Sequence, residues 1–174
     1  MDVKQLFDLT GKSAAITGGG GVLCGAIAQC LASAGARVAI LDLKLEAAQA
    51  VADLINKSDP AGNTDSPRAI AVAANVLERP SLEAAYEKCI EAFGQVDILV
   101  NGAGGNHPSA TTGPDKRFFD LPIDAFGKVM DLNILGTILP SMVFAKAMAQ
   151  RGEGIILNIA SMNAFRPLTK IAAY

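Results

Sequence analysis

Charged residues are scarce in this sequence of 174 residues, making up 18% of it against the roughly 25% of an average soluble protein. The formal net charge is −2, so no excess of positive charge favours binding to nucleic acid or to an anionic membrane. The N-terminal residues contain no apolar stretch of signal-peptide length, and no apolar run reaches the ~18 residues of a membrane span. These absences predict a cytoplasmic protein that binds neither nucleic acid nor membrane.

Cysteine and histidine are too few to form a recognisable metal site. Cys24, Cys30 and Cys89 fit no metal-binding spacing, and His107 is the only histidine. We therefore expect no metal. Each cysteine lies in an apolar stretch with helical spacing, so we expect three buried free thiols in a reducing compartment.

Hydrophobic residues make up 51% of the sequence, mostly in short runs that alternate with stretches of helical spacing. Strands that are buried on both faces have this composition. The alternation predicts one domain over residues 1–174 with a Rossmann-like, doubly wound parallel sheet between two helical layers, the last strand at an edge. The predicted strands are 13–17, 37–41, 69–73, 96–101 and 154–160. The predicted helices are 23–34, 45–55, a third capped by Ser81, and 123–149, with a bend at Pro140.

A run of four glycines follows the first predicted strand and leads directly into a helix. A phosphate group needs bare backbone N–H groups there, and the helix N-terminus adds a favourable dipole. The spacing G-x-G-x-x-G is not met, because Leu23 stands at the last glycine position. The alternative is a glycine-rich turn without a ligand. The predicted contacts with cofactor phosphates are Thr17, Gly18, Gly19, Gly20, Gly21, Val22 and Leu23.

Asp42 directly follows the second predicted strand, 22 residues after Gly20. A carboxylate in this place can accept hydrogen bonds from both hydroxyls of an adenosine ribose, and it would repel a 2′-phosphate. The position therefore favours NAD over NADP as the cofactor. The alternative is that Asp42 caps the helix that follows.

Several separated motifs resemble those of the short-chain dehydrogenase/reductase family, over nearly the whole chain. The family opens with T-G-x-x-x-G-x-G, and here Val22 and Cys24 stand at the two later glycine positions. Asn75 stands where the family usually has an acid against the adenine, and its amide can still accept a hydrogen bond; Val76 follows it. The family's N-N-A-G is matched after the fourth predicted strand. The resemblance implies further cofactor contacts from Asn75, Val76, Asn101, Gly102, Ala103 and Gly104.

The resemblance also implies a catalytic set of Asn133 in DLNILGT, Ser161 in NIASMNAF, and Tyr174 thirteen positions later. In the family the tyrosine exchanges the alcohol proton while nicotinamide exchanges the hydride. The serine binds the substrate oxygen, and the asparagine holds a water in a proton relay. The alternatives are that Ser161 is a polar cap after a strand and that Asn133 is a helix amide bonding a loop carbonyl.

The family's tyrosine is followed four residues later by a lysine, whose charge lowers the pKa of the phenol. This sequence stops at Tyr174. We therefore expect the 174-residue chain to be C-terminally incomplete relative to the family and inactive by itself. For the full-length form we expect a homodimer or homotetramer.

The segments TGGGGVLCGAIA, NGAGGNHP and SMNAFRPLTKIAAY resemble one branch of the family, the D-mannonate oxidoreductases or fructuronate reductases. That likeness implies a sugar acid as the small-molecule substrate. Arg166 is the predicted carboxylate clamp, because a guanidinium can bind a carboxylate through two hydrogen bonds. His107 and Asn163 are further predicted substrate contacts. The alternatives are a surface ion pair for Arg166 and a surface or packing role for His107.

Three hypotheses about function remain open on the sequence. The first is an NAD-dependent dehydrogenase acting on a secondary alcohol or ketone of a sugar acid. The second is a truncated fragment that binds nucleotide without turnover. The third, a flavodoxin-like or nucleotide-sugar protein, is disfavoured by the joint spacing of Asn101, Ser161 and Tyr174.

Overall fold

The computed structural model describes residues 6–58, 67–166 and 168–174. Its centre is a five-stranded, all-parallel sheet with the strand order β3-β2-β1-β4-β5. The predicted strand order along the chain is confirmed, and β5 does lie at an edge. The strands are β1 (Ser13–Thr17), β2 (Arg37–Asp42), β3 (Ala69–Ala73), β4 (Ile98–Asn101) and β5 (Ile155–Asn158).

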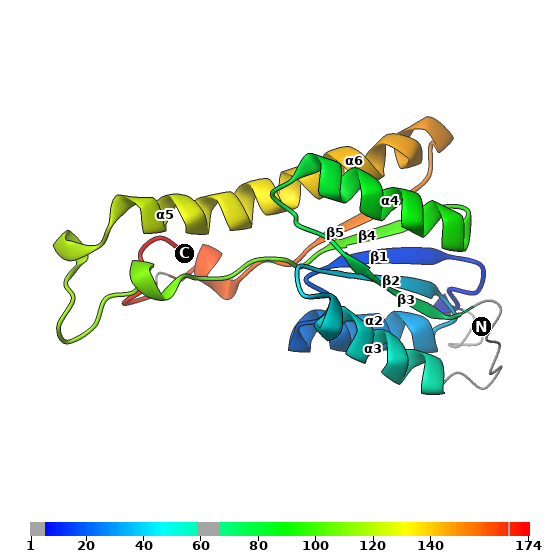
Figure 1. Cartoon of the computed structure of the whole chain (residues 1–174), viewed down its shortest axis with the longest axis horizontal. Coiled ribbons are helices and arrows are strands. Elements are labelled where there is room, and N and C mark those ends of the chain that lie inside the picture. The colour runs from blue at the N-terminus through cyan, green and yellow to red at the C-terminus, as the bar shows by residue number, and fades with distance from the viewer. Residues whose placement is uncertain (1–5, 59–66, 167) are drawn as a thin grey trace.

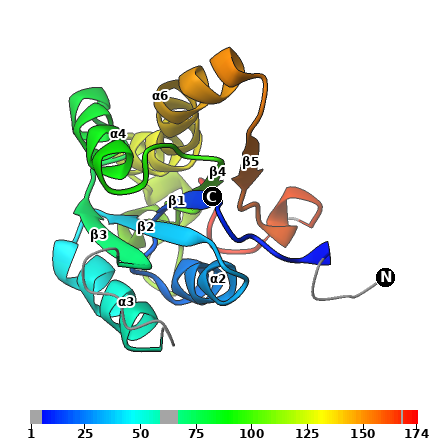
Figure 2. The ribbon, with the colours of Figure 1, turned by 90° about the vertical axis from the view of Figure 1, so that its right-hand side faces the viewer.

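Helices cover both faces of the sheet, which confirms the three-layer α/β/α architecture (Figures 1 and 2). One face carries α2 (Val22–Ser33) and α3 (Leu45–Ser58). The other carries α4 (Arg79–Phe93) and α6 (Gly136–Arg151), which continues from α5 (Ile123–Met130) through a π-helical segment, η3 (Asp131–Leu135).

Two hydrophobic cores lie on the two sides of the sheet because successive strand residues point to opposite faces. Ala14 and Ile16 of β1 belong to the core beneath α2 and α3. Ala15, between them, belongs to the core beneath α4 and α6, where Phe144 of α6 is fully buried. Double-sided burial explains why the strands are continuous apolar runs rather than alternating ones.

The carboxyl ends of the strands meet at one edge of the sheet. Thr17 of β1 pairs with Leu41 of β2 and with Asn101 of β4, and Asn101 pairs in turn with Asn158 of β5. Beyond this edge, the loop after β4, helix α5 and the segment after β5 project together (Figure 1). In open α/β sheets this edge is where ligands bind.

Three details of the helices differ from the prediction. The third helix begins at Arg79, with Glu78 as its N-cap, so the prediction that Ser81 caps it is wrong. The Ser81 hydroxyl instead accepts a hydrogen bond from the Asn75 N–H at 2.9 Å. Cys30 is exposed, because two residues along α2 turn it about 200° away from the buried Ala28.

The third difference concerns the long helix, whose irregular turn is η3 rather than the expected bend at Pro140. The Asn133 side chain donates to the Val129 carbonyl at 2.7 Å, taking the acceptor that the α-helical backbone would use. The combined helix Ile123–Arg151 is long and apolar enough to span a membrane by length and composition. Of its apolar window 28% is buried, and Pro140, Phe144 and Met148 are buried in the helical layer.

Candidate functional site

The glycine turn between β1 and α2 is backbone only, and at Gly18, Gly19 and Gly20 its neighbours leave no room for a Cβ. Gly18 has a φ of 64°, and a Cβ there would lie 2.9 Å from the Ala103 Cα. A Cβ on Gly20 would lie 2.7 Å from the Ala47 Cβ. Gly21 is the N-cap of α2 and offers no side-chain hydrogen bond to the helix. The first N–H groups of α2 are therefore free of a side-chain cap, as an anionic phosphate requires.

Asp42 lies at the end of β2 and is tied to the same turn. Its Oδ2 accepts a hydrogen bond from the Gly20 N–H at 3.0 Å. Its Oδ1 accepts one from the Lys44 N–H at 3.0 Å, just before α3 begins. The carboxylate thus bonds the N–H of the residue before the next helix, and it stands half-buried beside the glycine turn.

Cys24 and Gly102 explain how the turn tolerates a side chain where the family motif has glycine. Cys24 is buried, and its Sγ occupies the space that a Cβ on Gly102 would need. Gly102 stands where N-N-A-G has its second asparagine. The side-chain volume that the family pattern places in the loop after β4 is supplied here by Cys24 of α2. Val22, at the other departure, is 97% exposed and obstructs nothing. Burial, and secondarily the Asp42 carboxylate, raises the pKa of the Cys24 thiol.

Thr17 and Asn101 join the strand ends. The Thr17 hydroxyl accepts hydrogen bonds from the N–H groups of Gly102 at 3.1 Å and Ala103 at 3.2 Å. The buried Asn101 amide donates to Ser141 Oγ of α6 at 2.9 Å and to Asn158 Oδ1 of β5 at 2.8 Å. Within the described part of the chain, Asn101 Oδ1 has no hydrogen-bond partner. These bonds fix the N-G-A-G loop against both neighbouring strands.

Asn75 and Val76 follow β3 at the same edge, where Asn75 stabilises the local turn and Val76 packs against the long helix. Asn75 Oδ1 accepts from the Leu77 N–H at 3.1 Å, and its Nδ2 donates to Glu78 at 2.9 Å. Val76 is buried, with its Cγ2 against Gly136 of the long helix. Contact of either residue with an adenine stays a prediction.

Asn133 in η3 holds the loop that follows β4. Its Nδ2 donates to the Gly105 carbonyl at 2.7 Å, and its Oδ1 accepts from the Gly105 N–H at 3.0 Å. A Cβ on Gly104 would lie 2.8 Å from that Oδ1. The side chain therefore bonds a loop carbonyl, as the structural alternative expected, and its place is beside the N-G-A-G loop.

The segment after β5 carries the other residues of the predicted catalytic set. Ser161 is half-buried and accepts a hydrogen bond from the Asn163 N–H at 3.2 Å, capping the short turn η4 (Met162–Ala164). Tyr174 lies at the far end of this segment, and Ala173 beside it packs on a small cluster of Ala110, Ala125 and Val129. Arg166 is exposed.

His107 is half-buried in the loop after β4 and caps η1 (Pro108–Ala110), with its Nδ1 accepting from the Ser109 N–H at 3.1 Å. One ring nitrogen is thus committed to the loop. No cluster of three metal-ligating side chains occurs among the residues that the structure describes.

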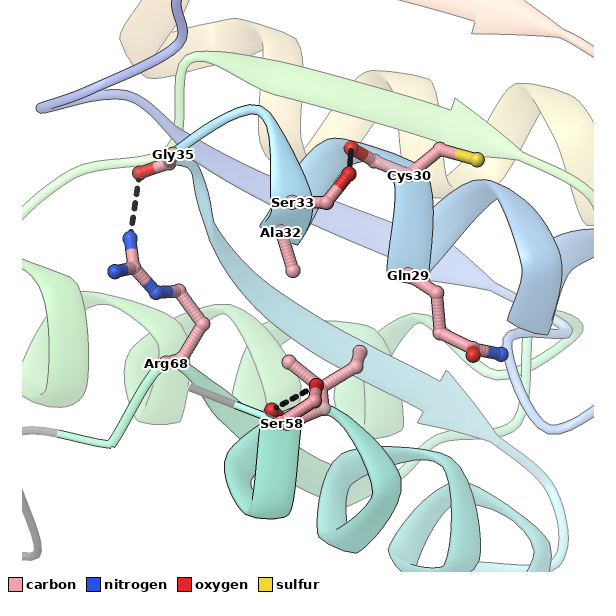
Figure 3. Close-up of a pocket in the computed structure, with 8 residues that line it drawn as sticks. Gln29, Cys30, Ala32, Ser33, Gly35, Ser58 and Arg68 are labelled. Atoms are coloured by element: carbon pink, nitrogen blue, oxygen red, sulfur yellow. Dashed lines mark hydrogen bonds between the residues drawn. The ribbon is translucent and has the colours of Figure 1, made fainter. Parts of the chain in front are cut away.

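A cavity of about 660 Å³ lies at the opposite end of the sheet, between the last turns of α2 and α3. Figure 3 shows it, with Arg68 donating to the Gly35 carbonyl at 2.8 Å. None of the predicted site residues lines it, and it is remote from the carboxyl edge of the strands. Its position separates it from the candidate site, whatever its size.

Sequence reasoning missed Ser141 and Asn158, which orient Asn101, and Cys24 as the partner of Gly102. Asn158 carried a usable signal, because it ends the fifth strand as Asn101 ends the fourth. Ser141 and Cys24 carried none, since each acts on a residue far away in the sequence.

The fold and these motifs together define the class of protein: the chain belongs to the short-chain dehydrogenase family, whose model matches residues 12–174. An uncharacterized oxidoreductase of Bacillus subtilis (strain 168) is 45% identical over 175 residues, covering 96% of this chain and 60% of its own length. The 7alpha-hydroxysteroid dehydrogenase of Escherichia coli (strain K12) is 33% identical over 95% of this chain and 59% of its own length.

Solved structures agree with this assignment. A candidate D-mannonate oxidoreductase from Haemophilus influenzae, solved with bound NAD, is 43% identical, with a TM-score of 0.86 over 99% of this chain and 63% of that one. An NAD⁺-bound xylitol dehydrogenase is 26% identical, with a TM-score of 0.81 over 95% of this chain and 58% of that one. The chain thus spans about 60% of the length of these relatives.

Proposed function

We propose that the protein is an NAD-dependent oxidoreductase that transfers hydride between nicotinamide and a secondary alcohol or ketone. The observation that carries the proposal is the bare glycine turn at the start of α2, with the Asp42 carboxylate hydrogen-bonded to it. When bound, NAD supplies the hydride acceptor. Its phosphates would lie against Thr17 and the four glycines and accept hydrogen bonds from the uncapped N–H groups of Val22 and Leu23. The N–H groups of Gly19, Gly20 and Gly21 already donate within the protein. Asn75, Val76 and the N-G-A-G loop would line its path.

NAD is proposed over NADP because Asp42 would oppose the charge of a 2′-phosphate and accept hydrogen bonds from a free ribose. Lys44, whose N–H donates to Asp42, follows two residues later, but its exposed ammonium is screened by solvent. The carboxylate, half-buried beside the turn, is therefore expected to decide the preference.

For the substrate, Ser161 would donate a hydrogen bond to the reacting oxygen, and the Tyr174 phenol would exchange a proton with that oxygen. Asn133 uses its amide on Gly105 and Val129, so its proposed role is to position the loop beside the site. A sugar acid of the D-mannonate type is the proposed substrate, with Arg166, His107 and Asn163 as its contacts. The name of the Haemophilus neighbour supports this class.

The remaining proposals concern the whole protein: a homodimer or homotetramer located in the cytoplasm. The second candidate function is nucleotide binding without turnover. It is favoured by the Asn133 amide, whose two N–H donors and oxygen are already engaged within the fold.

The proposal is tested by titrating NADH and NADPH into the protein and following nicotinamide fluorescence. NADH should bind more tightly than NADPH. Asp42→Ala should weaken NADH binding and reduce the difference in affinity between the two cofactors. Tighter binding of NADPH by the wild type would contradict the proposal.

In the full-length protein, Tyr174→Phe should remove most NAD-coupled turnover, since general acid–base groups supply a rate increase of about 10²–10⁴-fold. NADH binding without turnover would favour the second candidate.

A further inference from the structure

The loop after β4 lines a second cavity, of about 550 Å³, which is shallow and widely open to solvent at the carboxyl end of the sheet. Sites for small molecules commonly have volumes of about 300–1,000 Å³. This cavity belongs to the projecting part of the molecule that Figure 1 shows beyond the strands. Its lining is Asn106, Pro108, Thr111, Thr112, Gly113, Pro114, Asp115 and Lys116.

Lys116 lines this cavity and is held in place by backbone and side-chain hydrogen bonds. Gly113 and Lys116 exchange two backbone hydrogen bonds, of 2.9 and 3.2 Å, which close a tight turn. The half-buried side chain then folds back, and its Nζ donates to the Ser109 carbonyl at 2.9 Å. An ammonium has three donors, so two N–H groups remain for a ligand.

The other polar groups of the lining are oriented by the same loop. Asn106 Nδ2 donates to Thr111 Oγ1 at 2.8 Å, and that hydroxyl donates to the His107 carbonyl at 3.2 Å. The Thr112 hydroxyl donates to the Lys170 carbonyl at 3.3 Å. The lining thus combines one fixed cation and several ordered amide and hydroxyl groups with apolar surface from Pro108 and Pro114. Such a lining suits a ligand with one negative group and several hydroxyls on a carbon chain.

The cavity is joined to the segment that ends in Tyr174. The Thr112 N–H donates to the Lys170 carbonyl at 2.7 Å, across 58 positions of sequence. Ala110, fully buried in the same loop, packs in one cluster with Ala173. Two independent contacts therefore hold one wall of the cavity beside the backbone that carries the proposed proton-exchanging phenol.

Asp115 also lines the cavity, and its charge opposes that of Lys116. Asp115 is exposed, whereas Lys116 is half-buried and fixed by Ser109. Exposed charges are strongly screened by water and salt, so the ammonium dominates the field that a bound ligand would meet.

We propose that this cavity is the subsite for the carboxylate end of a polyhydroxylated acid, with Lys116 as its cation. The inference rests on the proposed function and deepens it by assigning substrate selectivity to the loop after β4. Lys116 and Arg166 are then rival clamps, and variants of each can tell them apart.

The test measures binding of D-mannonate, D-gluconate and neutral D-mannitol to the full-length protein by calorimetry, with NADH binding followed separately. Lys116→Gln should weaken binding of both acids about tenfold or more, because a hydrogen bond to a charged group is lost, and leave mannitol unchanged. Asp115→Asn is the matched control: removing the opposing charge should strengthen acid binding, by about two- to threefold for an exposed group.

Backbone amide NMR shifts provide a readout that does not depend on activity or on cofactor. Adding D-gluconate should shift the amide signals between Asn106 and Lys116 in the wild type but not in Lys116→Gln.

The proposal is overturned if Lys116→Gln weakens the binding of mannitol and of the acids equally, which would indicate a purely structural role, or if only Arg166→Gln loses acid binding. A wild type that binds NADH but neither acid also overturns it, while leaving the cofactor proposal intact. A wild type that binds the acids but not NADH contradicts the cofactor proposal alone.

Discussion

At the scale of single residues, the glycine turn keeps its packing because a side chain at one position is compensated by a glycine at another. Cys24 lies where the family pattern has glycine, and Gly102 leaves the space that its sulfur fills. Close packing makes such an exchange necessary, since an added atom on either side would overlap its neighbour. The turn keeps its shape although its sequence departs from the pattern.

Gly18→Ala should destabilise the protein more than Gly11→Ala does. Both glycines have positive φ, 64° and 82°, so both variants carry the left-handed penalty of about 1–2 kcal/mol. Only at Gly18 would the new Cβ also meet backbone, 2.9 Å from the Ala103 Cα, adding about 1–3 kcal/mol. Urea unfolding of the two variants measures the difference, and equal losses would show that the Ala103 backbone yields without cost.

The three thiols should react very unequally in the native protein at pH 8. Burial raises the pKa of Cys89 to about 12, and burial followed by the Asp42 carboxylate raises that of Cys24. A raised thiol pKa means less thiolate, which is the reactive form. A disulfide reagent that releases a chromophore should therefore titrate one thiol, Cys30, before unfolding and three after it.

Cys30→Ser is the control for that titration and should abolish the native-state reaction. Rapid reaction of two thiols in the wild type would mean that α2 or α4 opens more readily than its packing indicates.

At the scale of elements, the π-helical segment η3 connects the helical layer to the loop after β4. Asn133 makes three side-chain hydrogen bonds there, two to Gly105 and one to Val129. Thr137, one turn later, donates its hydroxyl to the Asn133 carbonyl at 3.1 Å. The irregular turn is thus satisfied by side chains and fixes the loop that carries the N-G-A-G residues.

Asn133→Leu should cost about 2–4 kcal/mol of unfolding free energy, because three hydrogen bonds are lost and their backbone partners are left unpaired. Thr137→Val, on the same helix, removes one bond and should cost about 1 kcal/mol or less. Hydrogen exchange at the Gly105 amide should accelerate in Asn133→Leu and stay unchanged in Thr137→Val. An unchanged Gly105 amide in both variants would argue against the positioning role.

At the scale of the whole molecule, the sheet has an exposed edge. All four residues of β5 are exposed, including the apolar Ile155 and Leu157, which share one face of the strand. Unpaired backbone groups beside apolar side chains favour pairing with another chain. The 174-residue chain should therefore associate as its concentration rises.

A lysine on this edge should reduce that association, because an edge charge opposes strand pairing. Light scattering over a concentration series should show smaller particles for Ile155→Lys than for the wild type. Leu54→Lys is the matched control, because it makes the same charge change at an exposed apolar position of α3. If both variants reduce association equally, net charge rather than the β5 edge is responsible.

The local pattern of the sequence determined the order of elements, the strand Ser13–Thr17 to the residue, the glycine turn and the acid that ends β2. These features follow from hydrophobic period and from glycine's freedom, which act between residues a few positions apart. The same pattern indicated the family, which the match over residues 12–174 confirmed.

Only the tertiary structure decided which partner each polar group found. Four features depend on the residues that pack opposite. They are the exposure of Cys30, the hydrogen bond from the Asn75 N–H to Ser81, the place of the Cys24 sulfur beside Gly102, and the hydrogen bonds of Asn133. The cavity that Lys116 lines likewise includes Thr112, whose hydroxyl and N–H both donate to the Lys170 carbonyl. The hydrophobic periodicity of the sequence determines which face of a helix or strand a residue lies on. The atoms that contact that face come from segments distant in the sequence, so they are determined only when the tertiary structure packs.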